Sequence, residues 1–456
     1  DGWRLIVIES DGSVRFLPAS GLTGLGNYAL VDKLRERFGP GYSVISIGQA
    51  GELLLPGAGI AVTDLKGRPN RFSARGGLGA VMGSRRIKAI LISDKGRVRP
   101  YIEDRNTFIR LAREFNVTVR ENPRSKALKD FGTASTVAFV NKICGLPTRN
   151  FSTGQFEAAD LISGEALREK ILSRGGEGVV GEACTPGCLI ECSNIFPDQN
   201  GRTVVGPIEY ETICLLGSNL GIGNLDDIAR LNFLCNDFGL DTIETGCALG
   251  VMAEAGLVEF GDARGFEKIV REIAEGGILG RLAGSGAALT GKVLGQRRVP
   301  AVKGQGISGY DPRGVKGTGV TFVTSPMGAD HTAGLTIFAP IDHGKRDGQI
   351  EASLNSQYTR AAYDALGLCV FLQSSVGSKP EMIAELMNAA FGEMYDGSFV
   401  RELGKKVILD EVAYNEAAGV TAAYDRLPEF FYSEPLPPTG NLFDFDLKEL
   451  ERIYLR

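Results

Sequence analysis

Three cysteines lie close together along the chain, and a fourth stands far downstream. Cys184, Cys188 and Cys192 share one short segment, and Cys369 ends the sequence Asp364-Ala-Leu-Gly-Leu-Cys369. Thiolate sulfur is a preferred ligand of iron and zinc, and cysteine thiolates hold cubane iron–sulfur clusters. The cysteines therefore indicate one-electron transfer, and they predict a contact between two distant parts of the chain.

Two other interpretations of these cysteines remain open, namely a structural zinc ion and buried free thiols. Zinc sites usually show paired C-x-x-C elements or nearby histidines, and neither accompanies this segment. Cys188 and Cys192 are four residues apart, which predicts that they share one helical face. The other four cysteines stand alone in apolar surroundings and are expected to be ordinary buried thiols: Cys144, Cys214, Cys235 and Cys247.

Two stretches share the form [Asp/Asn]-x-x-Gly-Leu-[Asp/Cys], and they suggest a polar binding role. The first runs from Asn236 to Asp241, and the second runs from Asp364 to Cys369. A carboxylate at the first position can accept two hydrogen bonds from an amino-pyrimidine edge, as in a pterin. The alternative is that the glycine simply ends a helix, which is compatible with the binding role.

A glycine-rich loop begins at Arg75 and continues Gly76-Gly77-Leu-Gly-Ala. Backbone N–H groups at Gly76 and Gly77 could meet an anion, and Arg75 would add a bidentate donor. The pattern does not follow the strand–turn–helix order of a dinucleotide site. On spacing alone, a tight turn with a surface arginine is the simpler interpretation.

Candidate acid–base residues lie in two further segments. His331, one of only two histidines, lies beside an aspartate in the Gly-rich stretch 304–334, and imidazole can shuttle protons near neutral pH. Glu209 and Glu211 follow the cysteine cluster, and burial would raise their pKa. Tyr310 could donate a hydrogen bond to a substrate oxygen. The competing interpretations are a structural histidine, a surface acidic pair at a helix start and a tyrosine packed against its loop.

Composition sets the broad class of the protein. The chain has 456 residues, 43% hydrophobic and 23% charged, with a net charge of -5. These values are typical of soluble globular proteins and leave no basic footprint for nucleic acid. No apolar run is long enough for a bilayer, and no secretory signal is visible. Clustered cysteines suit a metal in a reducing cytoplasm better than a disulfide framework, so we expect a cytoplasmic protein.

The pattern of elements predicts an α+β fold with three domains. Residues 1–103 form a β-rich base domain with strands near 3–9, 13–17, 43–47 and 89–92 and a helix at 28–38. Residues 104–309 form a mainly helical domain that contains the cysteine cluster, and residues 310–456 form a second helical domain that contains the fourth cysteine. The stretch 304–334 has little periodicity and is expected to be a long functional loop.

Together these motifs resemble those of the tungsten-containing aldehyde:ferredoxin oxidoreductase family. The matching stretches occur in the same order and span essentially the whole chain: 75–84, 184–192, 208–212, 239–241, 310–313, 328–331 and 364–369. The resemblance implies a base domain with two pterins that chelate tungsten or molybdenum, a nearby [4Fe–4S] cluster and a Mg²⁺ ion between the pterin phosphates. The implied reaction oxidises a small aldehyde to its carboxylic acid and passes electrons singly to ferredoxin or another iron–sulfur acceptor.

The same resemblance implies roles for individual residues. The cluster ligands would be Cys184, Cys188, Cys192 and Cys369. The pterin contacts would come from Arg75, Gly76, Gly77, Asn236, Asp241 and Asp364. Glu209 or Glu211 and His331 would flank the metal, with Tyr310 near the substrate.

The sequence also departs from the family pattern. The first gap between cysteines is one residue longer than in the common C-x-x-C-x-x-x-C, and Asn236 stands where an aspartate is usual. No E-x-x-H motif is present to bridge two subunits through iron. We expect a further N-terminal portion of the pterin domain ahead of Asp1, or else a homodimer or partner chain that supplies it. The alternative function is an incomplete, non-catalytic iron–sulfur electron-transfer protein without the pterin metal.

Overall fold

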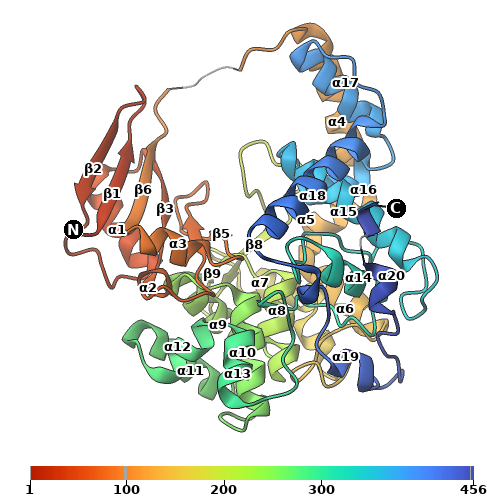
Figure 1. Cartoon of the computed structure of the whole chain (residues 1–456). Helices are drawn as coiled ribbons and strands as arrows, with labels where there is room; N and C mark the ends of the chain where they lie inside the picture. Colours follow the sequence, from red (N-terminus) through yellow and green to blue (C-terminus); the bar gives the residue numbers. More distant parts are fainter. Residues whose placement is uncertain (1, 97–99, 452, 456) are drawn as a thin grey trace.

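A six-stranded mixed sheet forms the N-terminal part of the molecule (Figure 1). The computed structural model describes residues 2–96, 100–451 and 453–455. The strand order is β2-β1-β6-β3-β4-β5; β1 pairs with β6 in parallel, and the other pairs are antiparallel. The strands are β1 (Arg4–Ile8), β2 (Val14–Pro18), β3 (Tyr42–Ser46), β4 (Ile60–Val62), β5 (Arg71–Ser73) and β6 (Ile87–Ser93).

Helix α1 (Asn27–Phe38) packs on this sheet because its apolar residues recur at helical spacing. Leu30, Val31 and Leu34 are buried against Leu5 and Val7 of β1. Two short helices complete the base: α2 (Gln49–Glu52) and α3 (Leu78–Ser84). The predicted strands and helix of this region are confirmed.

Helices dominate the rest of the chain, so the predicted α+β class is confirmed. Between the sheet and residue 300 they are α4 (Arg105–Glu121), α5 (Pro123–Phe131), α6 (Thr136–Lys142), α7 (Gly164–Arg174), α8 (Tyr210–Leu216), α9 (Leu225–Phe238), α10 (Thr242–Glu254), α11 (Ala263–Glu275), α12 (Ile278–Gly284) and α13 (Ala287–Leu294). The later helices are α14 (Lys316–Thr324), α15 (Gln349–Ala365), α16 (Gln373–Val376), α17 (Pro380–Phe391), α18 (Phe399–Ala417), α19 (Phe430–Ser433) and α20 (Leu447–Leu450).

Two small sheets interrupt the helices. One is three-stranded and antiparallel, with β7 (Val179–Glu182), β8 (Ser193–Pro197) and β9 (Thr203–Val205). The other pairs β10 (Ala301–Val302) with β11 (Gln305–Gly306). The loop between β7 and β8 contains the three clustered cysteines.

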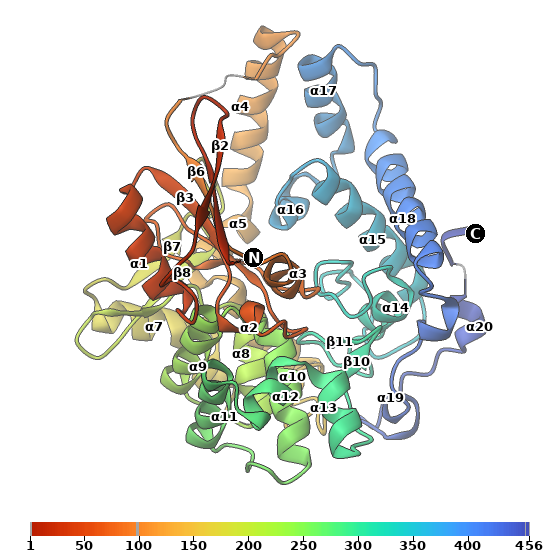
Figure 2. The same cartoon turned by 60° about the vertical axis from the view of Figure 1, so that its left-hand side comes forward.

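The helices pack into two apolar cores besides that of the base sheet. The largest core surrounds α8 and α10, and every residue of α10 from Ile243 to Ala253 is buried. A smaller core joins α4, α5, α15 and α17 with the cysteine loop. Figure 2 shows α15, α17 and α18 on the side of the molecule away from the base sheet. Both cores combine residues from before and after position 310, and the predicted domain boundaries stay predictions.

The expectation of one long loop at 304–334 was wrong. The segment contains β11 and the nine-residue helix α14, in which every residue is buried. A helix that is buried on all sides has no polar face and therefore shows no amphipathic period. None of the described helices combines the length and the apolar character that crossing a membrane requires.

Candidate active site

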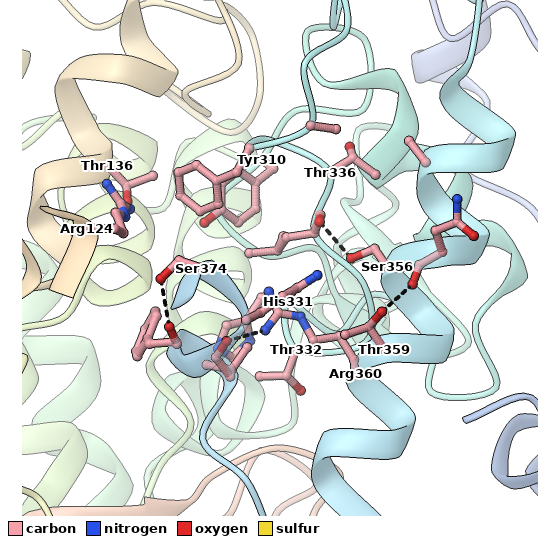
Figure 3. Close-up of a pocket in the computed structure, with 18 of the residues that line it drawn as sticks. Arg124, Thr136, Tyr310, His331, Thr332, Thr336, Ser356, Thr359, Arg360 and Ser374 are labelled. Atoms are coloured by element: carbon pink, nitrogen blue, oxygen red, sulfur yellow. Dashed lines mark hydrogen bonds between the residues drawn. The ribbon is translucent and has the colours of Figure 1, made fainter. Parts of the chain in front are cut away.

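The four predicted acid–base residues line a single cavity of about 980 Å³. Glu209 and Glu211 enter it from the start of α8, Tyr310 from the segment after β11, and His331 from the segment after α14. Helices α5 and α15 contribute further walls (Figure 3). Residues separated by more than a hundred positions in sequence therefore face one another.

Glu209 immediately precedes α8 and lies partly exposed at the cavity wall. The hydroxyl of Thr133 donates to its Oε2 at 2.5 Å. Burial raises the pKa of the Glu209 carboxyl, although Thr133 and the charges of Arg71 and His331 oppose this effect. A carboxyl in this environment can exchange a proton closer to neutral pH than an ordinary glutamate.

Glu211 lies in the first turn of α8 and is 8% exposed. The N–H of Gly309 donates to its Oε2 at 2.6 Å, whereas its Oε1 is buried without a hydrogen-bond partner among the described residues. Burial raises the pKa of this carboxyl as well. The interpretation as a surface acidic pair is excluded, because Glu211 is buried and Glu209 lines the cavity.

Tyr310 presents its hydroxyl to the cavity from a buried position. Its ring stacks on that of Tyr210, with centroids 5.1 Å apart, and Tyr210 donates to the carbonyl of Gly309 at 2.5 Å. Within the described part of the chain the Tyr310 hydroxyl has no hydrogen-bond partner. Burial raises its pKa well above the ordinary value, so it remains a proton donor.

His331 stands beside a buried aspartate. Its Nδ1 lies 3.7 Å from Oδ1 of Asp330, and the same oxygen accepts hydrogen bonds from the N–H and hydroxyl of Thr332. Burial alone would raise the pKa of Asp330, but the charges of His331 and Arg75 hold it below the ordinary value. Nδ1 of His331 is buried without a hydrogen-bond partner among the described residues, so Asp330 acts on the ring through its negative charge rather than through a hydrogen bond.

The Arg75 guanidinium is buried and bonded to other residues of the protein. Its Nε donates to Asp241 at 3.0 Å, and its two terminal nitrogens donate to the carbonyls of Ala329 at 2.8 Å and Gly306 at 2.6 Å. A terminal nitrogen also lies 3.6 Å from a carboxylate oxygen of Glu244. This buried guanidinium joins the base domain to the start of α10 and to the segment that ends at His331. It is not the surface arginine of the simpler interpretation.

Gly76 and Gly77 both adopt positive φ angles, +84° and +71°. A Cβ on Gly77 would come within 2.9 Å of the Pro56 carbonyl oxygen, whereas one on Gly76 would meet open space. Within the described ranges, the N–H groups of Gly76, Gly77 and Leu78 find no protein acceptor. Unpaired N–H groups on successive residues fit an anionic oxygen.

The remaining predicted pterin residues fall into two separate places. Asn236 is buried in α9, and Asp241 caps α10 by accepting from the N–H of Ile243 at 2.9 Å. Asp364 is exposed in the last turn of α15. Gly239 ends α9 in the left-handed conformation and Gly367 follows α15 with φ +67°, so the helix-ending role of both glycines is confirmed.

The four predicted cluster cysteines converge. Burial raises the pKa of the Cys192 thiol, and the charges of Glu209, Cys369, Cys184 and Cys188 raise it further. Cys184 and Cys369 are exposed, while the other two are partly buried against the α4–α17 core. The convergence of four sulfurs, one per iron, fits a cubane cluster. Within the described ranges, no group of three or more cysteine, histidine or acidic residues is arranged to hold a metal ion.

The expected helix through Cys188 and Cys192 was wrong. The segment between β7 and β8 is irregular, and both Gly187 and Glu191 have positive φ angles, +79° and +52°. Positive φ interrupts a right-handed helix. The four other cysteines are buried, as expected.

Sequence reasoning missed several residues of the site. Arg124 of α5 and Arg360 of α15 line the cavity, and Thr133 bonds Glu209. The aspartate beside His331 is evident from the sequence, and the structure places it 3.7 Å from the imidazole. The arginines carried no such signal, because an arginine in an amphipathic helix usually faces solvent.

Acid–base side chains in a cavity near a group of thiols are compatible with an oxidoreductase. Comparison with known proteins agrees. Residues 1–94 match the model of the aldehyde ferredoxin oxidoreductase N-terminal domain, and residues 110–456 match that of domains 2 and 3. The chain therefore belongs to the aldehyde ferredoxin oxidoreductase family and is an oxidoreductase of that type.

Individual relatives support this assignment. The tungsten-containing aldehyde ferredoxin oxidoreductase of Thermococcus kodakarensis is 31% identical over 96% of this chain and 76% of its own length. The WOR-like subunit of an aliphatic sulfonate oxidoreductase from Pyrococcus furiosus is 25% identical over 80% of this chain and 58% of its own length. Among solved structures, the active-site complex BamBC of benzoyl coenzyme A reductase, bound to 1,5-dienoyl-CoA, superposes with a TM-score of 0.76. It is 15% identical and covers 98% of this chain and 76% of its own, which supports the fold alone.

Proposed function

We propose that this protein oxidises aldehydes to carboxylic acids at a tungsten (or molybdenum) centre held by two pterins. Electrons then leave singly through a [4Fe–4S] cluster to ferredoxin or another iron–sulfur acceptor. The proposal rests on one observation, namely that the acid–base cavity and the cysteine group are close to each other. Glu209 lines the cavity, and its charge also acts on the Cys192 thiol of the cysteine group.

The reaction needs water, proton acceptors and an electron acceptor. Oxidation of an aldehyde to its acid consumes one water and releases two electrons and two protons. When bound, the pterin-held metal would supply the two-electron oxidation, and Mg²⁺ would offset the pterin phosphate charge. Arg75, Asn236, Asp241, Asp364 and the Gly76-Gly77 loop are the candidates to hold or support the pterins.

The chain's own side chains have separate roles in this proposal. The Tyr310 hydroxyl, which has no protein partner among the described residues, donates a hydrogen bond to the substrate carbonyl oxygen. His331 accepts a proton, and the neighbouring Asp330 stabilises the resulting imidazolium. Glu209 or Glu211 holds a second proton, which their raised pKa values favour.

The cysteine group fits the electron-transfer step. Cys184 and Cys369 are exposed, while Cys192 is partly buried and close enough to Glu209 for the glutamate charge to act on its thiol. A cluster held by all four thiols would lie between the cavity and the surface, where an iron–sulfur partner could approach.

Metal analysis and an aldehyde assay together test the function. Natively purified protein should contain tungsten or molybdenum and a fourfold excess of iron, and should reduce a viologen in the presence of aldehydes. His331→Asn should lower kcat by roughly 10²-fold or more, as expected for loss of a general base. His343→Asn is the matched control, since this second histidine does not line the cavity. Iron without tungsten or molybdenum would instead indicate an electron-transfer protein, and zinc alone would exclude both.

A further inference from the structure

Two arginines line the cavity without a role in the proposed oxidation. Arg124 projects from α5 and Arg360 from α15, on different sides of the pocket (Figure 3). Their charges both act on the hydroxyl of Tyr310, which places both guanidinium groups near the predicted position of the substrate.

Arg124 has no anionic partner among the described residues. Its side chain forms no hydrogen bond or ion pair within those ranges, and its guanidinium carbon lies 4.4 Å from the centroid of the Phe338 ring. Burial lowers the pKa of this group. An aromatic face orients a guanidinium while leaving its donors free for a ligand.

Arg360 is more deeply buried, at 8% exposure, and is only partly satisfied. One terminal nitrogen donates to the carbonyl of Val370 at 2.9 Å, but Nε is buried without a hydrogen-bond partner in the described part of the chain. Burial lowers the pKa of Arg360 to about 10, and Asp364 is the charge that most opposes this effect. Asp364 nevertheless does not approach within ion-pair distance in the described structure.

The cavity's own carboxyl groups do not neutralise the two arginines. Glu209 is bonded to Thr133, and Glu211 accepts from the N–H of Gly309. Neither of these glutamates forms an ion pair with Arg124 or Arg360 within the described ranges, and nor does Glu351, the third carboxylate that lines the cavity. Arg124 is partly exposed, so solvent in the cavity can reach its donors, whereas Nε of Arg360 is buried and unpaired within the described ranges. A buried charged donor without a partner is unfavourable, and an anionic ligand in the cavity would satisfy both groups.

We propose that the preferred substrates are aldehydes that carry a second, anionic oxyacid group, such as a carboxylate, which pairs with Arg124 and Arg360. This inference rests on the proposed function and names its substrate class. Guanidinium groups recognise planar oxyanions by bidentate hydrogen bonds. Leu335, Ile341 and Phe371 give the same cavity apolar walls that suit a short carbon chain.

The test compares two aldehydes of equal chain length, 4-oxobutanoate and butanal, on the holoenzyme. We expect the kcat/KM ratio of 4-oxobutanoate to butanal to exceed one in the wild type. It should fall roughly 10- to 100-fold in Arg124→Gln and in Arg360→Gln, in line with hydrogen bonds to charged groups. Arg124→Lys should retain part of the preference, because it keeps the charge and loses only the bidentate geometry. Arg113→Gln on exposed α4 removes a positive charge outside the cavity and should leave the ratio unchanged.

A second measurement separates this inference from the proposed function. Succinate is not an aldehyde, so its binding does not depend on turnover; succinamide is the neutral comparison. By calorimetry, succinate should bind the wild-type holoenzyme more tightly than succinamide, and both glutamine variants should lose that difference. An aldehyde oxidase with no preference for 4-oxobutanoate and no effect of the variants would overturn the substrate inference alone. Absence of all aldehyde oxidation would overturn the proposed function, and the succinate titration would still decide the anion site.

Discussion

The buried glutamates show how local environment changes the chemistry of an ordinary residue. Glu211 has one oxygen bonded to the Gly309 N–H and the other without a described partner. This is the arrangement of a group that can remain neutral, because the proton on the unpaired oxygen reduces the cost of burial. Its ordinary pKa of 4.5 is therefore raised.

Replacement of Glu211 by Gln should change how stability depends on pH. The folded protein holds the Glu211 proton at pH values where the unfolded chain has released it. Wild-type stability is therefore lost as pH rises from the ordinary pKa through the raised one, while the glutamine variant does not titrate there. We expect the unfolding free energy of the wild type relative to Glu211→Gln to fall between about pH 5 and about pH 8. Each unit by which folding raises the pKa of Glu211 adds about 1.4 kcal/mol to this pH-dependent difference in unfolding free energy.

Denaturant titrations at both pH values measure this difference. Glu416→Gln is the control, since it removes a carboxyl at an exposed position of α18. Equal pH dependence of the wild type and Glu211→Gln would contradict the assignment of a raised pKa to Glu211.

At the scale of single residues, the sequence allowed the rare residue types of the site to be predicted, but not which common residues surround them. Cysteines and histidines are rare in this chain, so Cys369 and His331 could be singled out. Arg124 and Arg360 are two of many basic residues, and only tertiary packing distinguishes a buried arginine from a solvated one. The buried hydrogen bonds from Arg75 to Asp241 and to the Gly306 carbonyl join segments that are distant in sequence, so they could not be predicted either.

Helix α15 is held in place by close packing against α18. A Cβ on Gly404 of α18 would overlap the carbonyl oxygen of Tyr358 in α15. Glycine is required there for close approach rather than for an unusual backbone angle. The contact fixes the position of Arg360, which lies half a turn beyond Tyr358.

Gly404→Ala should destabilise the protein by about 1–3 kcal/mol through overpacking, even though alanine favours a helix more than glycine does. The 4-oxobutanoate preference should weaken with it, because Arg360 would shift. Thermal and denaturant unfolding measure the first effect, and the substrate ratio measures the second. Glu402→Ala, at an exposed position on the same helix, should leave both close to wild type. If the unfolding free energy of Gly404→Ala equalled that of the wild type, α15 and α18 could move apart without loss of stability.

Periodicity predicted a helix where one face meets solvent and missed one where none does. Helix α1 was recognised because Leu30, Val31 and Leu34 recur at helical spacing and form its buried face. Helix α14 was missed because it is buried on every side. The irregular cysteine loop was mistaken for a helix because spacing alone does not reveal positive φ at Glu191.

Across the whole molecule, the cysteine group connects two distant parts of the chain. Cys184, Cys188 and Cys192 lie between β7 and β8 of the small sheet, whereas Cys369 follows α15. A bound cluster would link them covalently and limit their separation on unfolding. Iron should therefore stabilise the assembled protein as well as transfer electrons.

Cys369→Ser should reduce the iron content of the purified protein and lower its unfolding temperature, since one of four ligands is lost. Iron analysis, the visible absorption of the cluster and thermal unfolding provide the readouts. Cys235→Ala is the matched control, because this buried cysteine of α9 lies outside the group. That variant should lose stability but keep its iron. Full iron content in Cys369→Ser would exclude Cys369 as a ligand.

Helix α15 and the turn after it carry Arg360, Asp364 and Cys369 in a single run of ten residues. Length changes in this run should therefore be tolerated very unequally. Inserting one residue before Arg360 would rotate the rest of the helix by about 100° and would displace all three side chains together. Inserting one after Asp364 would leave the first two in place and move only the thiol. The number of residues between Arg360 and Cys369 is thus constrained. We expect natural insertions and deletions in close relatives to fall outside this segment.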